Sequence, residues 1–169
     1  MSARCAALLS TFVATGLLLS TVGGMRPHYI WNASNSVPIG LYHVQPATRL
    51  IVTDLVIVQP PGLLAAYLDL NGYLPVGVPM LKRVLALPGQ TVCRNGLTIA
   101  VDGIVVGLAY ERDGRGRPLP VWHGCRIIAD GDVFFMNWQS ADSLDGRYFG
   151  PLPASAVIGT AVAVWTAEE

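Results

Sequence analysis

Seven prolines in a long stretch with almost no charge constrain the fold of this chain more than any other feature. Residues 27–81 contain three charged side chains, Arg49, Asp54 and Asp69. The prolines of the stretch are Pro27, Pro38, Pro46, Pro60, Pro61, Pro75 and Pro79. A proline inside a helix removes a hydrogen bond and clashes with the preceding turn. The stretch therefore cannot form a membrane helix, and it predicts short strands joined by turns.

Short apolar runs rich in β-branched residues continue through the rest of the chain, and Pro-Gly, Asn-Gly and Asp-Gly pairs separate them. The predicted strands are Ile51–Val58, Val84–Leu87, Leu97–Val101, Ile104–Val106, Val121–Ile128, Val133–Asn137 and Val157–Val164. Asp102-Gly103 predicts a hairpin turn, and Leu63–Leu70 predicts one or two helical turns. We therefore expect a mainly β domain over residues 27–169, with a polar insertion or lobe at 107–130.

The N-terminal segment is long enough to cross a membrane. Between Arg4 and Arg26 lie 21 residues without a charge, and a spanning helix needs about 20 largely apolar residues. A cleavable signal peptide is the alternative, although Ser20–Gly24 is a poor cleavage site. Residues 1–26 are thus predicted to be a membrane anchor or a signal segment. In both cases the domain leaves the cytoplasm, and Arg4 favours an N-terminus on the inner side.

Composition and cysteine spacing exclude several classes of protein. Apolar residues make up 52% of the chain, and 11 basic side chains balance 11 acidic ones. This argues against disorder and against nucleic-acid binding through a basic face. No His/Cys cluster has metal-ligand spacing, so neither a metal nor a cofactor is predicted. In an exported domain Cys93 and Cys125 either form a disulfide or remain as two buried thiols.

Lys82 is the one lysine of the chain, beside ten arginines. In a β-strand it shares a face with Met80, Val84 and Ala86. Desolvation on such a face lowers the pKa of a lysine, and a neutral lysine is a competent general base near pH 7. The alternative is a lysine whose stem is buried while its amine reaches water.

Two further segments carry hydroxyl and acidic side chains. Ser36 lies on a bend marked by Pro38 and Gly40, which suits a serine nucleophile beside main-chain N–H groups. The alternative is a linker in which the serine and asparagine side chains only solvate the backbone. Residues 131–151 form a strand followed by a loop of aspartates, serines and an arginine. That loop either orients the lysine or forms a self-contained surface turn.

The three segments together, in this order, resemble the serine–lysine signal peptidase family, peptidase family S26. Residues 34–38 resemble the family's S-x-S-M-x-P box. Residues 81–90, Leu-Lys-Arg-Val-Leu-Ala-Leu-Pro-Gly-Gln, resemble its K-R-V-x-x-x-P-G-D box. Residues 131–151 resemble its G-D-N … S-x-D-S-R-Y-x-G-P box. The resemblance covers residues 31–162 and implies a signal-peptidase-like β-rich catalytic domain after one N-terminal membrane helix.

The resemblance also implies a role for each matching residue. Ser36 is the expected nucleophile and Lys82 the expected general base, with hydroxyl oxygen and amine nitrogen about 2.6–3.2 Å apart. The Ser34 hydroxyl and the Ser36 N–H are the expected oxyanion donors. Ser143 is expected to hydrogen-bond the lysine. Asp145 and Arg147 are expected to support the active-site loop.

Departures from the family pattern point to one branch of it. Ser36-Val37-Pro38 is one residue shorter than S-M-x-P, and Gly131-Asp132-Val133 replaces G-D-N. The whole pattern of residues 32–42, N-x-[ST]-x-S-x-P-x-G-x-Y, instead resembles the conjugative-transfer branch, the TraF-like peptidases, whose catalytic residues are a serine, a lysine and an aspartate. Asp145 is the matching aspartate and is therefore a third expected catalytic residue.

The expected function is that of a membrane-associated serine endopeptidase that processes a conjugative pilin precursor. Water or the pilin's own amine resolves the acyl-enzyme, and an amine would close a cyclic product. The resemblance implies a membrane-tethered partner and a catalytic domain on the periplasmic side of a bacterial inner membrane. The first alternative is a general signal peptidase that removes signal peptides.

Three other readings are less well supported by the residues. A Ser-His-Asp hydrolase would need His28, His43 or His123, none of which lies in a recognisable nucleophile elbow. A thiol protease would rest on Cys93 or Cys125. A non-enzymatic, membrane-anchored scaffold of a transfer apparatus explains the anchor and the strands, but it leaves the serine–lysine pattern unexplained.

Overall fold

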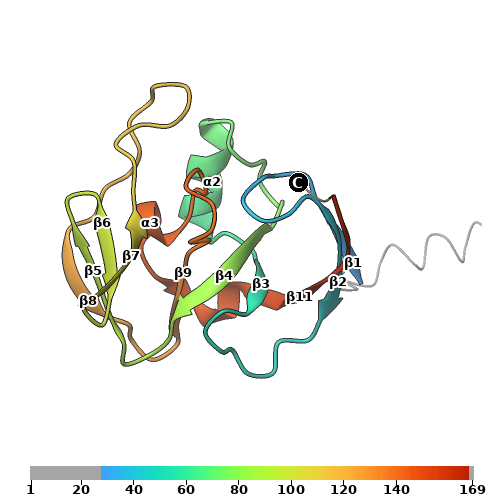
Figure 1. Ribbon diagram of the computed structural model, residues 1–169. Coiled ribbons are helices and arrows are strands. Elements are labelled where there is room, and N and C mark those ends of the chain that lie inside the picture. The colour runs from blue at the N-terminus through green and yellow to red at the C-terminus, as the bar shows by residue number, and fades with distance from the viewer. Residues whose placement is uncertain (1–27, 168–169) are drawn as a thin grey trace, which may run out of the picture.

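The computed structural model describes residues 28–167, which form two antiparallel sheets and two short helices (Figure 1). The prediction of a mainly β fold is confirmed. The strands are β1 (Tyr29–Asn32), β2 (Gly40–Gln45), β3 (Leu55–Val58), β4 (Met80–Ala86), β5 (Thr91–Asn95), β6 (Thr98–Val101), β7 (Ile104–Leu108), β8 (Gly124–Ile127), β9 (Asp132–Phe135), β10 (Leu152–Pro153) and β11 (Val157–Thr166). The helices are α2 (Gly62–Leu70), α3 (Gly146–Phe149) and the 3-10 turn η1 (Ala154–Ala156).

The predicted membrane segment, residues 1–26, lies outside the described residues. Within residues 28–167, none of the helices combines the length and the apolar character needed to span a bilayer.

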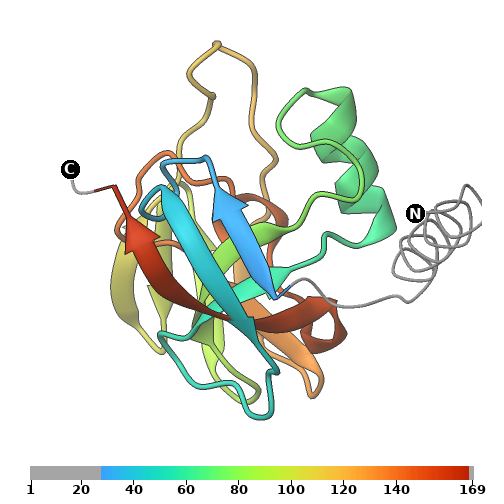
Figure 2. The same ribbon diagram turned by 90° about the vertical axis from the view of Figure 1, so that its right-hand side faces the viewer.

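The larger sheet has the strand order β1-β2-β11-β3-β4-β9-β10. Its organising element is β11, whose first residues pair with β3 and whose later residues pair with β2. Register shifts on both sides bend this long strand, as β-bulges do. Figure 2 shows β11 curving across the molecule beside β2. The bend brings the end of β11 next to the loop that follows β1.

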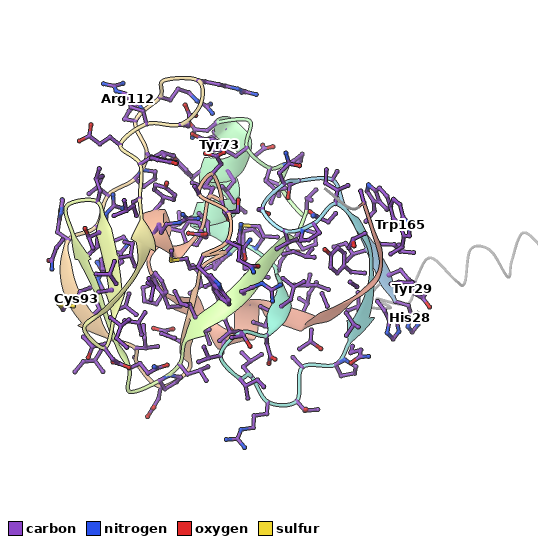
Figure 3. All side chains as sticks on the ribbon, in the orientation of Figure 1. His28, Tyr29, Tyr73, Cys93, Arg112 and Trp165 are labelled. Atoms are coloured by element: carbon purple, nitrogen blue, oxygen red, sulfur yellow. A yellow bond between two sulfur atoms is a disulfide. The ribbon has the colours of Figure 1, made fainter. Side chains whose placement is uncertain are left out.

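The smaller sheet has the order β7-β6-β5-β8. The predicted hairpin at Asp102-Gly103 is present: Val101 pairs with Ile104, and both turn residues have positive φ, 49° and 82°. Cys93 and Cys125 face each other on β5 and β8 and are joined by a disulfide. Figure 3 shows Cys93 on the small sheet, on the side opposite Trp165 and Tyr29.

Strand β4 lies in the middle of the protein between β3 and β9. Met80, Lys82, Val84 and Ala86 are all buried, as the strand alternation predicts. Met80 and Val84 pack with Val56, Val58, Leu68, Val133, Phe135 and Leu152. Leu81 packs into a separate cluster with Val37, Tyr42, Val44, Ile57 and Ala161. Both faces of this strand are therefore covered, which puts Lys82 in the interior.

Several boundaries differ from the sequence prediction. Helix α2 matches the predicted turns at 63–70, but β3 begins at Leu55 because residues 51–54 form a turn. There the Ile51 N–H donates to the Asp54 carboxylate at 2.9 Å, and Thr53 has φ 83°. Strands β1, β2 and β5 were not predicted, since the polar and Pro/Gly residues around β1 and β2 resemble a linker. β2 pairs with β11, which is distant in sequence, and β1 in turn pairs with β2. β5 pairs with β6 and β8 in the smaller sheet.

Candidate active site

A cleft of about 1410 Å³ opens at one end of the larger sheet, and the three predicted segments meet there. Residues 30–39, 78–82 and 139–144 line it, together with parts of α2, the segment after it and the end of β11. Ser34, Ser36, Lys82 and Ser143 all line this cleft. Asp145 and Arg147 are buried behind its wall.

The bend that carries Ser36 is shaped by one buried side chain, that of Asn32 at the end of β1. Its Nδ2 lies 2.8–3.1 Å from the carbonyl oxygens of Ser34, Val37 and Pro38. Its Oδ1 accepts from the main-chain N–H and the hydroxyl of Ser34, at 3.2 and 2.9 Å. A single amide thus replaces the backbone pairing that this tight loop cannot make itself. The position of the Ser36 hydroxyl depends on it.

Gly40 has a packing role that the sequence did not predict. A Cβ at this position would lie 2.1 Å from the main-chain oxygen of Trp165. The glycine therefore allows β2 to approach the end of β11 closely, rather than loosening the bend around Ser36. This contact places Thr166 and Ala167 at the edge of the cleft.

Lys82 points from β4 into the cleft wall, and 4% of the residue is exposed. Its Nζ donates to the Ser143 hydroxyl oxygen at 2.9 Å. Asn137 holds the strand on both sides of the lysine. Its Oδ1 accepts from the Arg83 N–H at 2.9 Å, and its Nδ2 donates to the Leu81 oxygen at 3.2 Å. The amine is therefore fixed in place by strand and loop together.

Burial lowers the pKa of Lys82 from its ordinary value of 10.5 to about 8. The nearby Asp145 carboxylate opposes this shift, and the Arg147 guanidinium adds to it. Desolvation prevails because the free energy lost in taking the charged amine out of water exceeds the free energy gained from its attraction to one carboxylate. At pH 7 about a tenth of the molecules then carry a neutral lysine. A group of this kind can accept a proton near neutral pH.

Asp145 and Arg147 form a buried, bidentate ion pair, with Nε–Oδ1 and Nη2–Oδ2 distances of 2.9 Å. Arg147 also donates to the carbonyl oxygens of Ser140, Ala141 and Ser143, at 2.6, 3.1 and 3.1 Å. Asp145 accepts from the Asn137 N–H at 3.0 Å. The pair fixes the loop that carries Ser143. The hydrogen bonds of Asp145 thus support the loop, and its influence on Lys82 is electrostatic.

The two central side chains line one cleft but hydrogen-bond to different serines. The Ser36 and Ser34 hydroxyl oxygens are 3.0 Å apart, and since Ser34 donates to Asn32, Ser36 is the donor of that pair. No hydrogen bond joins Ser36 to Lys82, although both lie in the described range 28–167. The expected direct contact is therefore not formed in this structure. The hydroxyl can rotate, and catalytic contacts of empty sites often tighten only with substrate.

The remaining candidates lie away from this cleft. The Cys93–Cys125 pair belongs to the small sheet and is oxidised, which leaves neither cysteine as a thiol nucleophile. His43 contacts Tyr29 at the edge of the larger sheet, with the two rings tilted by 46°. Within residues 28–167, no three His, Cys, Asp or Glu side chains gather where they could hold a metal ion.

Asn32 and Asn137 are the functional residues that sequence reasoning missed. Asn32 ends β1 and Asn137 lies two residues after β9, and asparagine is common near such turns for local reasons. Asn137 instead binds carbonyl and N–H groups on β4, up to 56 positions away, and Asn32 binds the main chain of the bend that carries Ser36. The asparagine beside a serine-rich bend was visible in the sequence, but its role was not.

Comparison with known proteins gives concordant matches. A family model described as signal peptidase, peptidase S26, matches residues 2–166. The conjugal transfer protein TraF of Agrobacterium fabrum is 36% identical over 165 residues, covering 89% of this chain and 91% of that protein. A probable conjugal transfer protein TraF of Sinorhizobium fredii is 37% identical over 168 residues, covering 92% and 85%. A probable signal peptidase I-1 of Synechocystis is 34% identical over 121 residues, covering 72% and 56%.

Proposed function

This chain belongs to the signal peptidase family, peptidase S26, and on that premise we propose that it is a serine endopeptidase with Ser36 as nucleophile and Lys82 as general base. One observation carries the proposal. The single lysine of the chain is buried, has a pKa lowered to about 8, and lines the same cleft as Ser36. A buried lysine costs folding free energy, so a structural role alone gives no reason for it to be there.

The chemistry is acyl transfer. The Ser36 hydroxyl turns from Ser34 toward Lys82, the neutral amine takes its proton, and the oxygen attacks a peptide carbonyl. The oxyanion accepts from the Ser36 N–H and from the Ser34 hydroxyl, which turns away from Asn32. The Ser34 main chain stays fixed meanwhile, because its N–H still donates to Asn32.

Collapse of the tetrahedral intermediate breaks the peptide bond and leaves an ester on Ser36. The departing amine takes the proton from Lys82, which becomes neutral again. The same lysine then deprotonates the second nucleophile. Water yields a free carboxylate, whereas a peptide amine yields a new amide and returns a joined chain.

The proposed substrate is a membrane-tethered pilin precursor. Support comes from the relatives named for conjugal transfer, which match this chain over 91% and 85% of their own length. The uncharged residues 5–25 support an anchor in the bacterial inner membrane, with the cleft on the periplasmic side. A general signal peptidase is the second candidate, which the similarity to the probable signal peptidase I-1 of Synechocystis favours.

The test follows precursor processing in membranes that contain the chain or its variants. Ser36→Ala and Lys82→Ala should each abolish processing, while Ser155→Ala, an exposed serine outside the cleft, should leave it unchanged. Normal processing by Lys82→Ala would refute the proposal. Mass spectrometry of the product separates the acceptors, since a cyclic product is lighter than the linear one by one water.

The pH profile provides a second test. With a Lys82 pKa of about 8, the rate of acylation should rise about tenfold per pH unit below pH 8 and level off above it. Single-turnover cleavage of an ester or peptide probe between pH 6 and 10 measures it. A rate that is constant from pH 6 to 8 would show that Lys82 is not the base.

A further inference from the structure

The cleft contains few charged side chains. Among its described lining residues, the charged side chains are Lys82 and Asp142. Lys82 is buried and hydrogen-bonded to Ser143, whereas Asp142 is exposed. Every other lining side chain, from Ile30 to Ala167, is uncharged. The cleft therefore presents one accessible charge to an occupant, and it is negative.

Asp142 is also without a partner. Within residues 28–167 its carboxylate forms no hydrogen bond and no ion pair, and the charges that act on Lys82 are those of Asp145 and Arg147. Some other aspartates of the domain do have partners. Asp113, on the neighbouring loop, accepts from the Tyr73 hydroxyl at 2.7 Å and from Arg117 at 2.6 Å. Asp69, Asp130 and Asp132 also lack a side-chain partner within residues 28–167, but of these unpaired carboxylates Asp142 is the one that lines the cleft.

The loop holds Asp142 in a fixed place. The carbonyl oxygens of Ala141 and Ser143, on either side of it, both accept from Arg147 at 3.1 Å. The Ser143 side chain accepts from Lys82. A backbone that is already held loses little further freedom when its side chain binds a ligand. The backbone of Asp142 is therefore preorganised, one residue from the group that positions the proposed base.

A second hollow meets the cleft at this point. It has a volume of about 380 Å³, lies under the loop after β7, and shares Tyr73, Asp142 and Leu144 with the cleft. Figure 3 shows Tyr73 near α2 and Arg112 on the projecting loop at the same end of the molecule. A group that extends from the cleft into this hollow passes Asp142.

We propose that Asp142 is a specificity-determining residue that binds a cationic group of the substrate, an ammonium or guanidinium close to the reacting peptide. The inference rests on the proposed function in one respect, that the occupant of the cleft is a peptide chain. An isolated carboxylate in a neutral, partly enclosed cleft attracts a cation more strongly than the same group on an open surface. The cation has two sources: a lysine or arginine side chain, or the amino terminus that could resolve the acyl-enzyme.

Binding to an inactive enzyme tests the inference without requiring cleavage. The protein is the full chain with Ser36→Ala, purified in a mild detergent. The probes are alanine- and valine-rich dodecapeptides with a C-terminal fluorophore, each with a lysine or an uncharged norleucine at one scanned position, and with a free or acetylated amino terminus. Fluorescence anisotropy gives the dissociation constants.

The cationic probe should bind about threefold to tenfold more tightly than its neutral counterpart. Loss of the preference on replacing lysine by norleucine identifies a side chain as the source, and loss on acetylation identifies the amino terminus. Asp142→Asn should remove the preference, and Asp142→Lys should reverse it for a glutamate probe. Asp130→Asn, an exposed aspartate outside both hollows, should keep it.

Equal binding of cationic and neutral probes, or an unchanged preference in Asp142→Asn, would overturn the inference. The precursor-processing assay separates this failure from a failure of the proposed function. An enzyme that processes its precursor normally but shows no cation preference contradicts the inference alone. Loss of processing in Asp142→Asn to the level of Ser36→Ala would also contradict it, because a specificity residue alters substrate preference rather than the chemistry.

Discussion

Replacing Lys82 with methionine should stabilise the folded protein while abolishing its peptidase activity. Burial lowers the pKa of this lysine from 10.5 to about 8, and each pKa unit corresponds to about 1.4 kcal/mol. The protonated amine therefore costs the folded state about 3 kcal/mol at neutral pH. Methionine has a similar unbranched shape and no charge. It leaves the Ser143 hydroxyl without its donor, which costs about 1 kcal/mol, so the expected net gain is about 2 kcal/mol at pH 7.

The pH dependence of that gain identifies its cause. The folded-state pKa lies below the unfolded-state pKa, so below about pH 8 the lysine is protonated in both states and its full cost is present. Between pH 8 and 10.5 the unfolded chain holds a proton that the folded chain has released, and wild-type stability rises relative to that of the variant. The difference in stability should therefore change by about 3 kcal/mol over this range, so that Lys82→Met becomes about 1 kcal/mol less stable than wild type at the alkaline end.

Urea unfolding followed by tryptophan fluorescence measures the difference in stability between wild type and Lys82→Met. The protein is the full chain in detergent, with the disulfide oxidised. The free energies of unfolding of wild type and variant are compared at pH 7, 9 and 10.5, so that tyrosine titration cancels in the difference. Arg83→Met on the same strand is the control, because arginine stays charged throughout. A Lys82→Met protein that is less stable than wild type by the same amount at all three pH values would refute the reasoning.

Three further outcomes are expected. Asn32→Ala should lower the processing rate at least tenfold in single-turnover assays, because the bend that carries Ser36 loses five hydrogen bonds to one side chain. Circular dichroism should show that the domain stays folded. An unaltered processing rate would contradict this prediction. Cys93→Ser with Cys125→Ser should lower the free energy of unfolding by about 2–4 kcal/mol but preserve processing below the melting temperature, since the pair lies outside the cleft. Arg147→Lys keeps the charge but loses the donors to the carbonyl oxygens of Ser140, Ala141 and Ser143. Thermal melting should therefore show that the free energy of unfolding falls by about 2 kcal/mol. A melting temperature equal to that of wild type would contradict the proposal that Arg147 holds this loop.

Local patterns account for the parts of the structure that the sequence predicted correctly. The Asp102-Gly103 hairpin follows from a turn that needs two residues with positive φ. The buried face of Lys82 follows from strand alternation around Met80 and Val84. Both depend on residues that are close in the chain, so a reader of the sequence has all the relevant information.

Contacts between distant segments account for what was missed. The strand that begins at Gly40 forms against Trp165 and Thr166, more than a hundred residues away. The side chain of Asn137 holds the backbone of Leu81 and Arg83. No periodicity or spacing marks such pairs, because the hydrogen bonds exist only once the sheets have closed.

The sequence by itself determined the chemistry that is available: one lysine, a serine on a Pro/Gly bend, and a loop of acidic and hydroxyl side chains in the order of the signal peptidase family. The tertiary structure decided how these groups behave. Burial in the cleft wall lowers the pKa of Lys82, and the Asn32 side chain, by accepting the Ser34 hydroxyl, leaves Ser36 to donate to Ser34. The hydrogen bonds from Arg147 hold the loop on which Asp142 is the one free charge in the described cleft. The physical reason is that a residue type carries its functional group with it, whereas solvation, hydrogen-bond partners and neighbouring charges are set by segments that only the fold brings together.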